Sequence, residues 1–387
     1  MRDPAALASL LPEGREIGRV AGKRGPTLIA VAGIHGNELA GVIAARRVIE
    51  RLSRDDVTVR GELVAIAGNL AAARLGQRYI ARDLNRVWTD EQVAAVEARA
   101  EADLDSEDLE QLEILAAVRA AIARATGPVY LVDLHTTSAH GVPFALFGDT
   151  LVQRAFVSAL PLPNIMGLEE QLDGVLSAYF THHGCITFAV EGGQHDDPGS
   201  IDDLEAALLL GAAAAGIIAR GAVDETRAAH ALLERRRGNL PPIMEVFARY
   251  AIAPEDEFKM EPGFKNIDPA RADQLLARDR HGEIRAPSDG LVMLPLYQGQ
   301  GNDGFFWGRA MSPRRLRASE ALRHLKLDRF LEWLPGVARD PEHPSRLIVK
   351  QHLARLYPRE VFRIFGYRRI RHQSDVLTAE RQREQSF

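Results

Sequence analysis

Short apolar runs alternate with longer Ala/Leu-rich runs of helical spacing along the first 220 residues of the chain. The short runs are rich in β-branched residues and are bounded by glycine or polar residues, which is typical of strands. We expect strands at 27–33, 62–67, 129–134, 143–147 and 185–191, and helices at 38–52, 109–125, 151–160 and 202–220. Strands that alternate with helices predict an α/β fold with a mostly parallel or mixed central sheet flanked by helices.

The pattern changes after residue 237, where Gly238, Pro241 and Pro242 indicate a boundary. Alternating runs at 243–250 and 283–293 and a glycine-rich hairpin near 299–304 predict a small all-β domain. From about residue 312 the chain is rich in arginine, and we expect it to be helical. The sequence therefore predicts three parts: an α/β domain at 1–237, a small β domain at 238–311 and a helical basic C-terminal extension at 312–387.

Composition narrows the class of protein. With 387 residues, 46% of them hydrophobic, the chain is long enough for two globular domains. A formal net charge of -5 gives no reason to expect nucleic acid or an anionic membrane as a partner. Cys185 is the single cysteine, which suits a reducing compartment, and its apolar surroundings favour a buried thiol over a nucleophile. No apolar stretch approaches the roughly 18 residues of a spanning helix, and the N-terminus is a poor match to a signal peptide. We expect a cytoplasmic protein.

Three residues carry the chemistry of a metal site. His35 and Glu38 follow the first predicted strand, and His135 ends the strand predicted at 129–134. Two imidazoles and one carboxylate with an open fourth position are the ligand set of a catalytic zinc. Such a site lowers the pKa of a bound water to about 7 and polarises a carbonyl oxygen. One histidine after a strand is more often structural, so the prediction depends on all three residues.

Two carboxylates accompany this ligand set. Glu191 ends the strand predicted at 185–191, and two glycines after it leave room for a substrate. Because ligands bind beyond the carboxyl ends of parallel strands, we expect Glu191 to lie near the metal, as a general base for a metal-activated water. The alternative is an exposed carboxylate at a strand end. Asp133 shares a strand face with His135 and is placed to orient that histidine.

A polar segment at 78–86 is a candidate substrate site. Its sequence, R-Y-I-A-R-D-L-N-R, contains Arg78, Asn85 and Arg86. The planar guanidinium of arginine suits a carboxylate or a developing oxyanion, and Asn85 adds two donors and an acceptor. Taken alone, the segment is more typical of a solvated loop held by Arg–Asp pairs.

The ordered series G-I-H-G-N-E, R-Y-x-x-x-D-L-N-R, D-L-H and E-G-G resembles the succinylglutamate desuccinylase/aspartoacylase family, over roughly residues 25–310. These are zinc-dependent deacylases related to zinc carboxypeptidases. The resemblance implies a zinc carboxypeptidase-like catalytic domain at 1–237 with one Zn²⁺ per chain, and it implies these roles: metal ligands His35, Glu38 and His135; catalytic carboxylate Glu191; carbonyl-polarising Arg78; substrate-carboxylate-binding Asn85 and Arg86.

Two features depart from the family pattern. Aspartoacylases carry a further arginine about ten residues before the catalytic glutamate, whereas residues 177–183 here contain none. N-acetylaspartate is therefore not the substrate that we expect, although His182 and His183 lie in this region. The C-terminal extension has no counterpart in the compact members of the family.

The sequence predicts a zinc-dependent amidohydrolase that removes an acyl group from the amine of a small N-acyl amino acid-like substrate. One alternative is a zinc carboxypeptidase acting on peptides, which would have an open groove without a capping β domain. Another is a non-catalytic binding protein, which would have lost a ligand or the catalytic carboxylate. The acyl group, the amine, the choice between amide and ester, and the oligomeric state, including a homo-oligomer, stay open.

Overall fold

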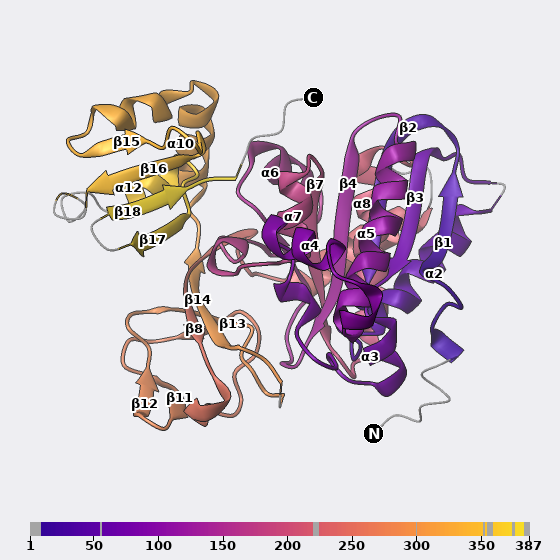
Figure 1. The fold of residues 1–387 in the computed structure, drawn as a ribbon, viewed down its shortest axis with the longest axis horizontal. Coiled ribbons are helices and arrows are strands. Elements are labelled where there is room, and N and C mark those ends of the chain that lie inside the picture. Colours follow the sequence, from indigo (N-terminus) through magenta and orange to yellow (C-terminus); the bar gives the residue numbers. More distant parts are fainter. Residues whose placement is uncertain are drawn as a thin grey trace.

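A mixed β-sheet runs through most of the molecule (Figure 1). The computed structural model describes residues 9–54, 56–219, 224–298, 300–350, 353, 359–373 and 376–382. Within them, eleven strands pair in the order β1-β3-β2-β4-β7-β5-β6-β8-β14-β13-β10. Their bounds are β1 Glu16–Ala21, β2 Lys23–Ala32, β3 Arg60–Ala67, β4 Val129–Thr137, β5 Phe144–Phe147, β6 Asn164–Met166, β7 Ile186–Gln194, β8 Ile243–Ala251, β10 Asp268–Ala270, β13 Gly290–Met293 and β14 Asp303–Ala310. The β2–β3, β2–β4 and β4–β7 pairs are parallel, whereas β1–β3 and β5–β7 are antiparallel, which confirms the predicted mostly parallel or mixed sheet.

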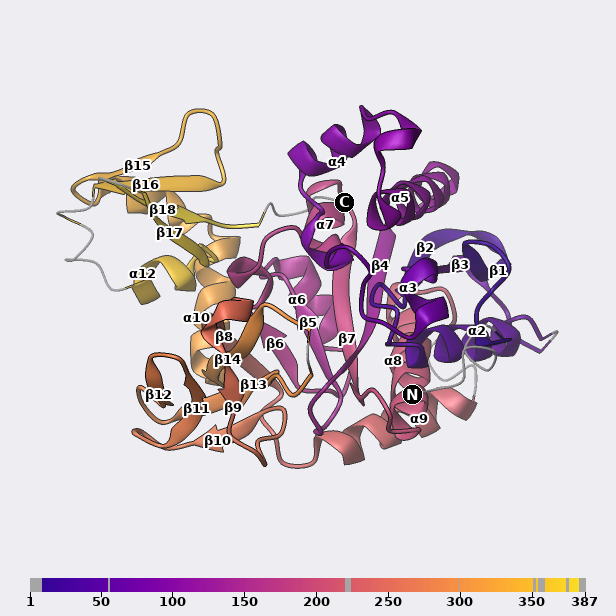
Figure 2. The same ribbon diagram turned by 60° about the horizontal axis from the view of Figure 1, so that its bottom comes forward.

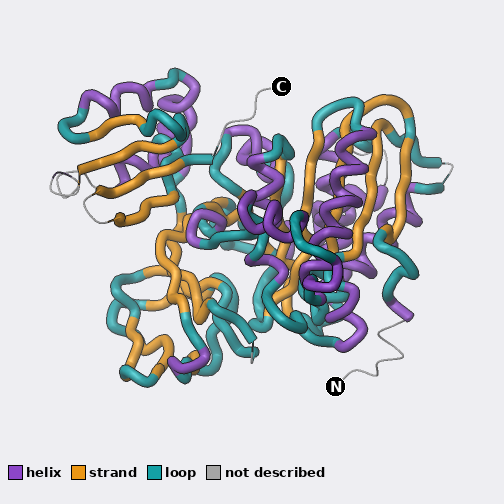
Figure 3. Tube along the Cα trace, in the orientation of Figure 1, coloured by secondary structure: helices purple, strands orange, loops and turns teal. Residues whose placement is uncertain are grey.

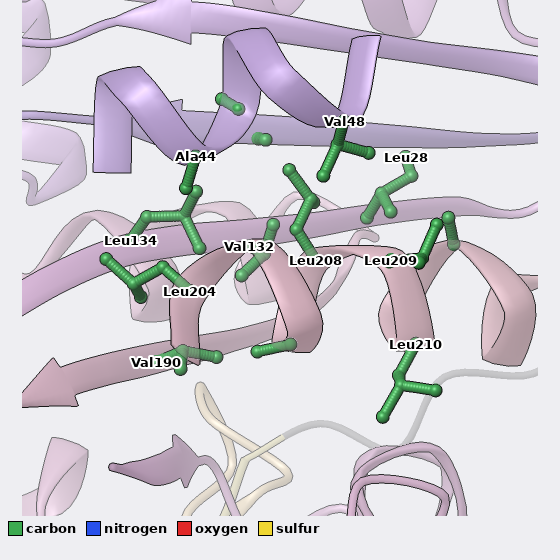
Figure 4. Close-up of a cluster of buried hydrophobic side chains, with 14 of the residues drawn as sticks. Leu28, Ala44, Val48, Val132, Leu134, Val190, Leu204, Leu208, Leu209 and Leu210 are labelled. Atoms are coloured by element: carbon green, nitrogen blue, oxygen red, sulfur yellow. The ribbon is translucent and has the colours of Figure 1, made fainter. Parts of the chain in front are cut away.

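Helices cover both faces of this sheet because its central strands are apolar on both sides. Side chains alternate along β2, so Leu28 and Ala30 face one core while Ile29 and Val31 face the other. The first core contains α2 (Ala40–Leu52) and α8 (Gly199–Ala215), and Figure 4 shows Val48 and Leu208 from these helices beside the strands. The second core contains α5 (Ser106–Arg124) and α7 (Leu176–His182). The remaining helices of this part are α3 Leu70–Leu75, α4 Asp90–Glu97, α6 Leu151–Val157 and α9 Asp224–Arg237.

The predicted β region after residue 238 continues the central sheet. Strand β8 pairs with β6 in parallel and with β14 in antiparallel orientation, so the sheet passes directly from one part to the other. A separate three-stranded sheet lies beside it, as Figure 2 shows, with β9 Lys259–Met260, β11 Leu275–Asp279 and β12 Gly282–Arg285. The all-β character predicted for this region is thus confirmed.

The residues after 312 form a subdomain of helices and strands, which we call the C-terminal subdomain (residues 313–382). Its helices are α10 Pro313–His324 and α12 Arg359–Ile364. The expectation of a purely helical extension is wrong, because a four-stranded antiparallel sheet is also present (Figure 3), with β15 Val337–Arg339, β16 Arg346–Lys350, β17 Arg369–Gln373 and β18 Val376–Glu380. Leu347 and Val349 lie two residues apart on one face of β16, and they pack into a small core with Leu377, Phe362 and Tyr367.

None of the described helices combines the length and the hydrophobicity needed to cross a membrane.

Candidate metal centre and active site

The three predicted metal ligands meet at the carboxyl edge of the central sheet. His35 and Glu38 lie in the connection between β2 and α2, and His135 lies near the end of β4. Donor atoms of these three buried residues lie within 4.8 Å of one another. Glu38 Oε1 is 2.8 Å from His35 Nδ1, and Glu38 Oε2 is 2.9 Å from His135 Nδ1. The sequence motif thus becomes a compact cluster of two imidazoles and one carboxylate.

Close backbone packing holds the His35 loop in place. The chain leaves β2 through Gly33, whose φ of +77° is a left-handed conformation that glycine adopts without strain. Gly36 N donates a hydrogen bond of 3.0 Å to Arg78 O. A Cβ at Gly36 would lie 2.3 Å from Ala73 N, so the loop fits against α3 because this residue has no side chain. The glycines of the motif therefore set the position of the histidine between them.

Two aspartates fix the orientation of the imidazoles. His135 Nε2 lies 2.8 Å from Asp133 Oδ2, and His35 Nε2 lies 3.1 Å from Asp83 Oδ1. The opposite ring nitrogens, Nδ1, are thereby turned toward Glu38. Metal-binding histidines commonly bond a carboxylate through the nitrogen that does not bind the metal. Asp133 was expected in this role, whereas Asp83 was missed, although it belongs to the 78–86 motif. The sequence does contain a local indication of Asp83, because its side chain caps the short helix Leu84–Arg86. It accepts a hydrogen bond of 2.9 Å from Asn85 N.

The electrostatics of the cluster favour a cation at its centre. Burial opposes ionisation of Glu38, but His35 and His135 beside it hold its pKa well below the ordinary value. Burial likewise disfavours a charged His135, but Asp133 and Glu38 raise its pKa well above the ordinary value. The carboxylate is thus held ionised among groups that stabilise positive charge. A divalent cation at the same atoms can take the place of the imidazole protons.

Glu191 lies beside the cluster on β7. It is the register partner of His135, and side chains of directly paired residues project on the same face of a sheet. Glu191 lines the pocket next to the cluster, and its Oε2 atom has no hydrogen-bond partner within the described part of the chain. Burial raises its pKa to about 8. A cation bound nearby would favour the ionised form and lower that pKa. A carboxyl group with one oxygen unengaged by the described residues suits a general base at this position.

The three polar residues predicted to contact substrate line the same pocket, but each already has protein partners. Arg78 Nη2 donates to Asp83 Oδ2 at 3.0 Å. Asn85 Oδ1 accepts from the backbone of α7, at Leu176 N, at 2.8 Å. Arg86 Nη2 pairs with Asp303 Oδ2 on β14 at 2.7 Å, while its Nε has no partner among the residues described. Asp303 was missed because no local signal links it to a residue 217 positions away.

Two segments distant in sequence complete the pocket. One precedes β14 and contributes Leu294, Leu296 and Gln298; the other lies between β6 and α7 and contributes Leu168, Glu169, Leu172 and Val175. Gln298 Oε1 is 3.2 Å from His195 Nε2, and Thr136 Oγ1 is 2.8 Å from the Nδ1 atom of the same ring. The described residues that line the pocket do not include His182 or His183. Neither histidine therefore replaces, in this pocket, the arginine that aspartoacylases carry before the catalytic glutamate.

Comparison with known proteins finds relatives of the catalytic part of the chain. The sequence model of the succinylglutamate desuccinylase/aspartoacylase catalytic domain matches residues 24–212. Succinylglutamate desuccinylases of Pseudomonas syringae pv. tomato and Burkholderia pseudomallei are 37% identical over 83 residues and 31% identical over 133 residues, respectively. These matches cover 21% and 34% of this chain, and 25% and 37% of the relatives' own length. The crystal structure of a succinylglutamate desuccinylase/aspartoacylase from Rhodobacter sphaeroides superposes with a TM-score of 0.55 at 17% identity, covering 76% of this chain and 88% of that one.

The fold and the matched domain define the class of protein, an α/β protein with a mixed central sheet and a catalytic-domain match over residues 24–212. Residues 24–212 are similar to the catalytic domain of the succinylglutamate desuccinylase/aspartoacylase family, and the fold is that of solved structures of this family.

Proposed function

We propose that the protein is a zinc-dependent amidohydrolase that removes the acyl group from the amine of a small N-acyl amino acid-like substrate. One observation carries this proposal: the His35, Glu38 and His135 cluster lies at the end of the sheet where Glu191, with an unengaged carboxyl oxygen, is paired with His135. The similarity of residues 24–212 to the succinylglutamate desuccinylase/aspartoacylase catalytic domain supports a deacylase.

The donor set suits one zinc ion per chain. Its two nitrogens and one carboxylate are typical zinc ligands, and both imidazoles are oriented by aspartates as in zinc sites. When bound, the ion supplies Lewis acidity, which polarises a carbonyl and lowers the pKa of water.

Side chains of the pocket supply the remaining chemistry. Glu191 is placed to accept a proton from the attacking water and to deliver it to the leaving amine. The guanidinium of Arg78, held by Asp83 and Glu38, presents fixed positive charge for the oxygen of the scissile carbonyl. Such preorganised charge costs no reorganisation when the oxyanion develops.

Arg86 and Asn85 are proposed to bind the carboxylate of the amino-acid part. Arg86 keeps an unengaged Nε, and the Nδ2 of Asn85 lies 3.3 Å from His135 Nε2, at the edge of the metal cluster. The partner Asp303 competes for the guanidinium, so we expect this anchor to be weaker than one made by a free arginine.

The walls of the pocket favour a small substrate over a peptide. Leu294 and Leu296, from the region after 238, and Leu172, from the catalytic part, line the same pocket. This supports a capped site more than the open groove of a carboxypeptidase. The intact ligand set and Glu191 also favour an enzyme over a binding protein. A cytoplasmic location, and the absence of nucleic-acid and membrane partners, belong to the same proposal.

A substrate panel tests the proposal. The zinc-loaded protein is incubated with N-acyl amino acids that differ in acyl length and side chain, and the release of free amine is measured. We expect turnover of at least one neutral N-acyl amino acid and loss of turnover on chelation. Absence of amine release across the panel, with zinc bound, would refute the function.

A further inference from the structure

A buried charge network fixes the C-terminal subdomain to the catalytic part. Asp149, which follows β5, accepts from Arg154 at 2.6 Å and from Arg323 of α10 at 3.1 Å, and it also pairs with Arg368. Arg368 donates in addition to Glu245 of β8 at 2.6 Å. Both carboxylates are at most 1% exposed. Loss of one partner would leave an uncompensated buried charge, so the network strongly favours one docked position.

A second contact from the subdomain reaches the substrate pocket. Gln382 Nε2 donates a hydrogen bond of 2.8 Å to Glu169 Oε2, whose other oxygen accepts from Ser177 Oγ at 2.5 Å. Glu169 and Ser177 both line the pocket. A Cβ at Gly148 would lie 1.8 Å from Gln382 Oε1, so a larger residue there would displace the amide of Gln382 from this position. The side chain of Gln382 therefore packs closely against Gly148.

A third contact comes from strand β17. Arg369 and Arg371 are two residues apart on this strand and therefore project on the same face. Both pair with Asp173, and Arg369 also donates to Leu172 O at 3.0 Å. Leu172 is a lining residue of the substrate pocket. The same stretch of chain is therefore held by two elements of the subdomain.

The stretch that receives these contacts, residues 168–177, is the pocket-wall segment. Between β6 and α7 it contains a single short helix, Glu169–Gln171, so little of its backbone is fixed by regular secondary structure. Leu168, Leu172 and Val175 pack into a core on its inner side. On its outer side, Gln382, Arg369 and Arg371 supply the polar contacts.

We propose that the C-terminal subdomain is a positioning element of the active site, which holds the pocket-wall segment through Gln382, Arg369 and Arg371 and so determines which substrates fit. The expected effect on substrate choice rests on the proposed function. A subdomain that served stability alone would not alter the choice among substrates that differ in size.

Two variants test this role against a matched control. Gln382→Ala and Arg369→Met remove contacts to the pocket-wall segment, whereas Arg346→Ala removes ion pairs with Asp340 and Glu380 inside the subdomain. We expect KM to rise about 10-fold in the first two variants, the effect of losing one hydrogen bond to a charged group, with a smaller change in kcat. Discrimination between short and long acyl groups should weaken, with zinc content and Tm retained. Unchanged KM and discrimination in both variants would overturn the proposal.

Hydrogen–deuterium exchange gives a readout that does not depend on turnover. Amides of residues 168–175 should exchange faster in Gln382→Ala and Arg369→Met than in the wild type or Arg346→Ala. Equal exchange in all four proteins would refute the positioning role whatever the activity. Faster exchange in a protein that hydrolyses no N-acyl amino acid would support the positioning role and refute the proposed function.

Discussion

His135 on β4 and Glu191 on β7 face each other as direct register partners in a parallel strand pair. Adjacent strands lie about 4.8 Å apart, so the sheet itself, and not a loop, sets the spacing between the candidate metal ligand and the candidate base. A change of register by one residue would turn one of the two side chains to the other face. The pairing of two central strands therefore sets the position of Glu191 relative to His135.

Glu191→Gln should preserve the metal site and remove the base. Glutamine has nearly the same shape, and Glu191 is not among the three clustered ligands. We expect bound zinc close to the wild-type content and a fall in kcat of about 10²–10⁴-fold, the usual contribution of a general base. Glu205→Gln, on the surface of α8, is the control. Half of wild-type turnover in Glu191→Gln would show that the carboxylate is not catalytic.

Asp83→Asn should weaken zinc binding without removing a ligand. Asp83 orients His35 through Nε2, and loss of such a partner typically costs about 10–100-fold in metal affinity. Competition with a chromophoric chelator measures the change. His35→Ala should lower bound zinc well below one per chain. Wild-type affinity in Asp83→Asn would mean that the aspartate does not orient the ligand.

Substrates with a free α-carboxylate should be preferred over their amides. One charge-assisted hydrogen bond contributes about 1.5–3 kcal/mol, or roughly 10–150-fold in kcat/KM, and Asp303 should keep the effect near the lower end. Arg86→Met should abolish the preference. A second carboxylate on the amine part should add little, so a preference for N-acetylaspartate above roughly 100-fold at pH 8 would contradict this description of the pocket.

Acid should loosen the contact between the C-terminal subdomain and the catalytic part. Burial disfavours the charged forms of Asp149 and Glu245, but the arginines around them hold both pKa values below the ordinary range. In an unfolded chain the pKa values of aspartate and glutamate are about 3.9 and 4.3. The two carboxylates therefore stabilise the fold fully above about pH 5, and this stabilisation is lost as the pH falls through 4 and below.

Urea unfolding between pH 7 and pH 3 measures this dependence. Asp149→Asn should lower the free energy of unfolding at pH 7 by about 3–5 kcal/mol, because three arginines then share an uncharged partner. Its stability should also change less with pH than that of the wild type. If the free energy of unfolding changed with pH equally in both proteins, Asp149 would not contribute to the pH dependence, which would contradict its role in the network.

The sequence is informative wherever a functional residue follows a strong local pattern. His35, His135 and Glu191 each stand at the end of an apolar run, so their convergence follows from a parallel sheet alone. Asp303 begins β14, and Gln298 lies in the segment before that strand. The pairing of β14 with β8 depends on contacts distant in sequence, and no local pattern reports such contacts.

The C-terminal subdomain shows a second limit. The sequence predicts a helical basic extension, yet Arg323, Arg363 and Arg368 are buried because Asp149 and Glu245, from earlier parts of the chain, neutralise them. The charge of a residue in the sequence does not reveal whether a partner far along the chain will bury it. The strands β17 and β18 were also missed, because each has only five residues and so short a run gives little pattern from which to predict a strand.

Titration of the metal-free protein with zinc tests the central claim most directly. Amine release from the best N-acyl amino acid is followed as zinc is added, in the wild type and in His35→Ala. We expect turnover to rise linearly up to one zinc per chain and then to stay constant, with no such rise in His35→Ala. Full turnover in the metal-free wild type, or an equal response in His35→Ala, would contradict it.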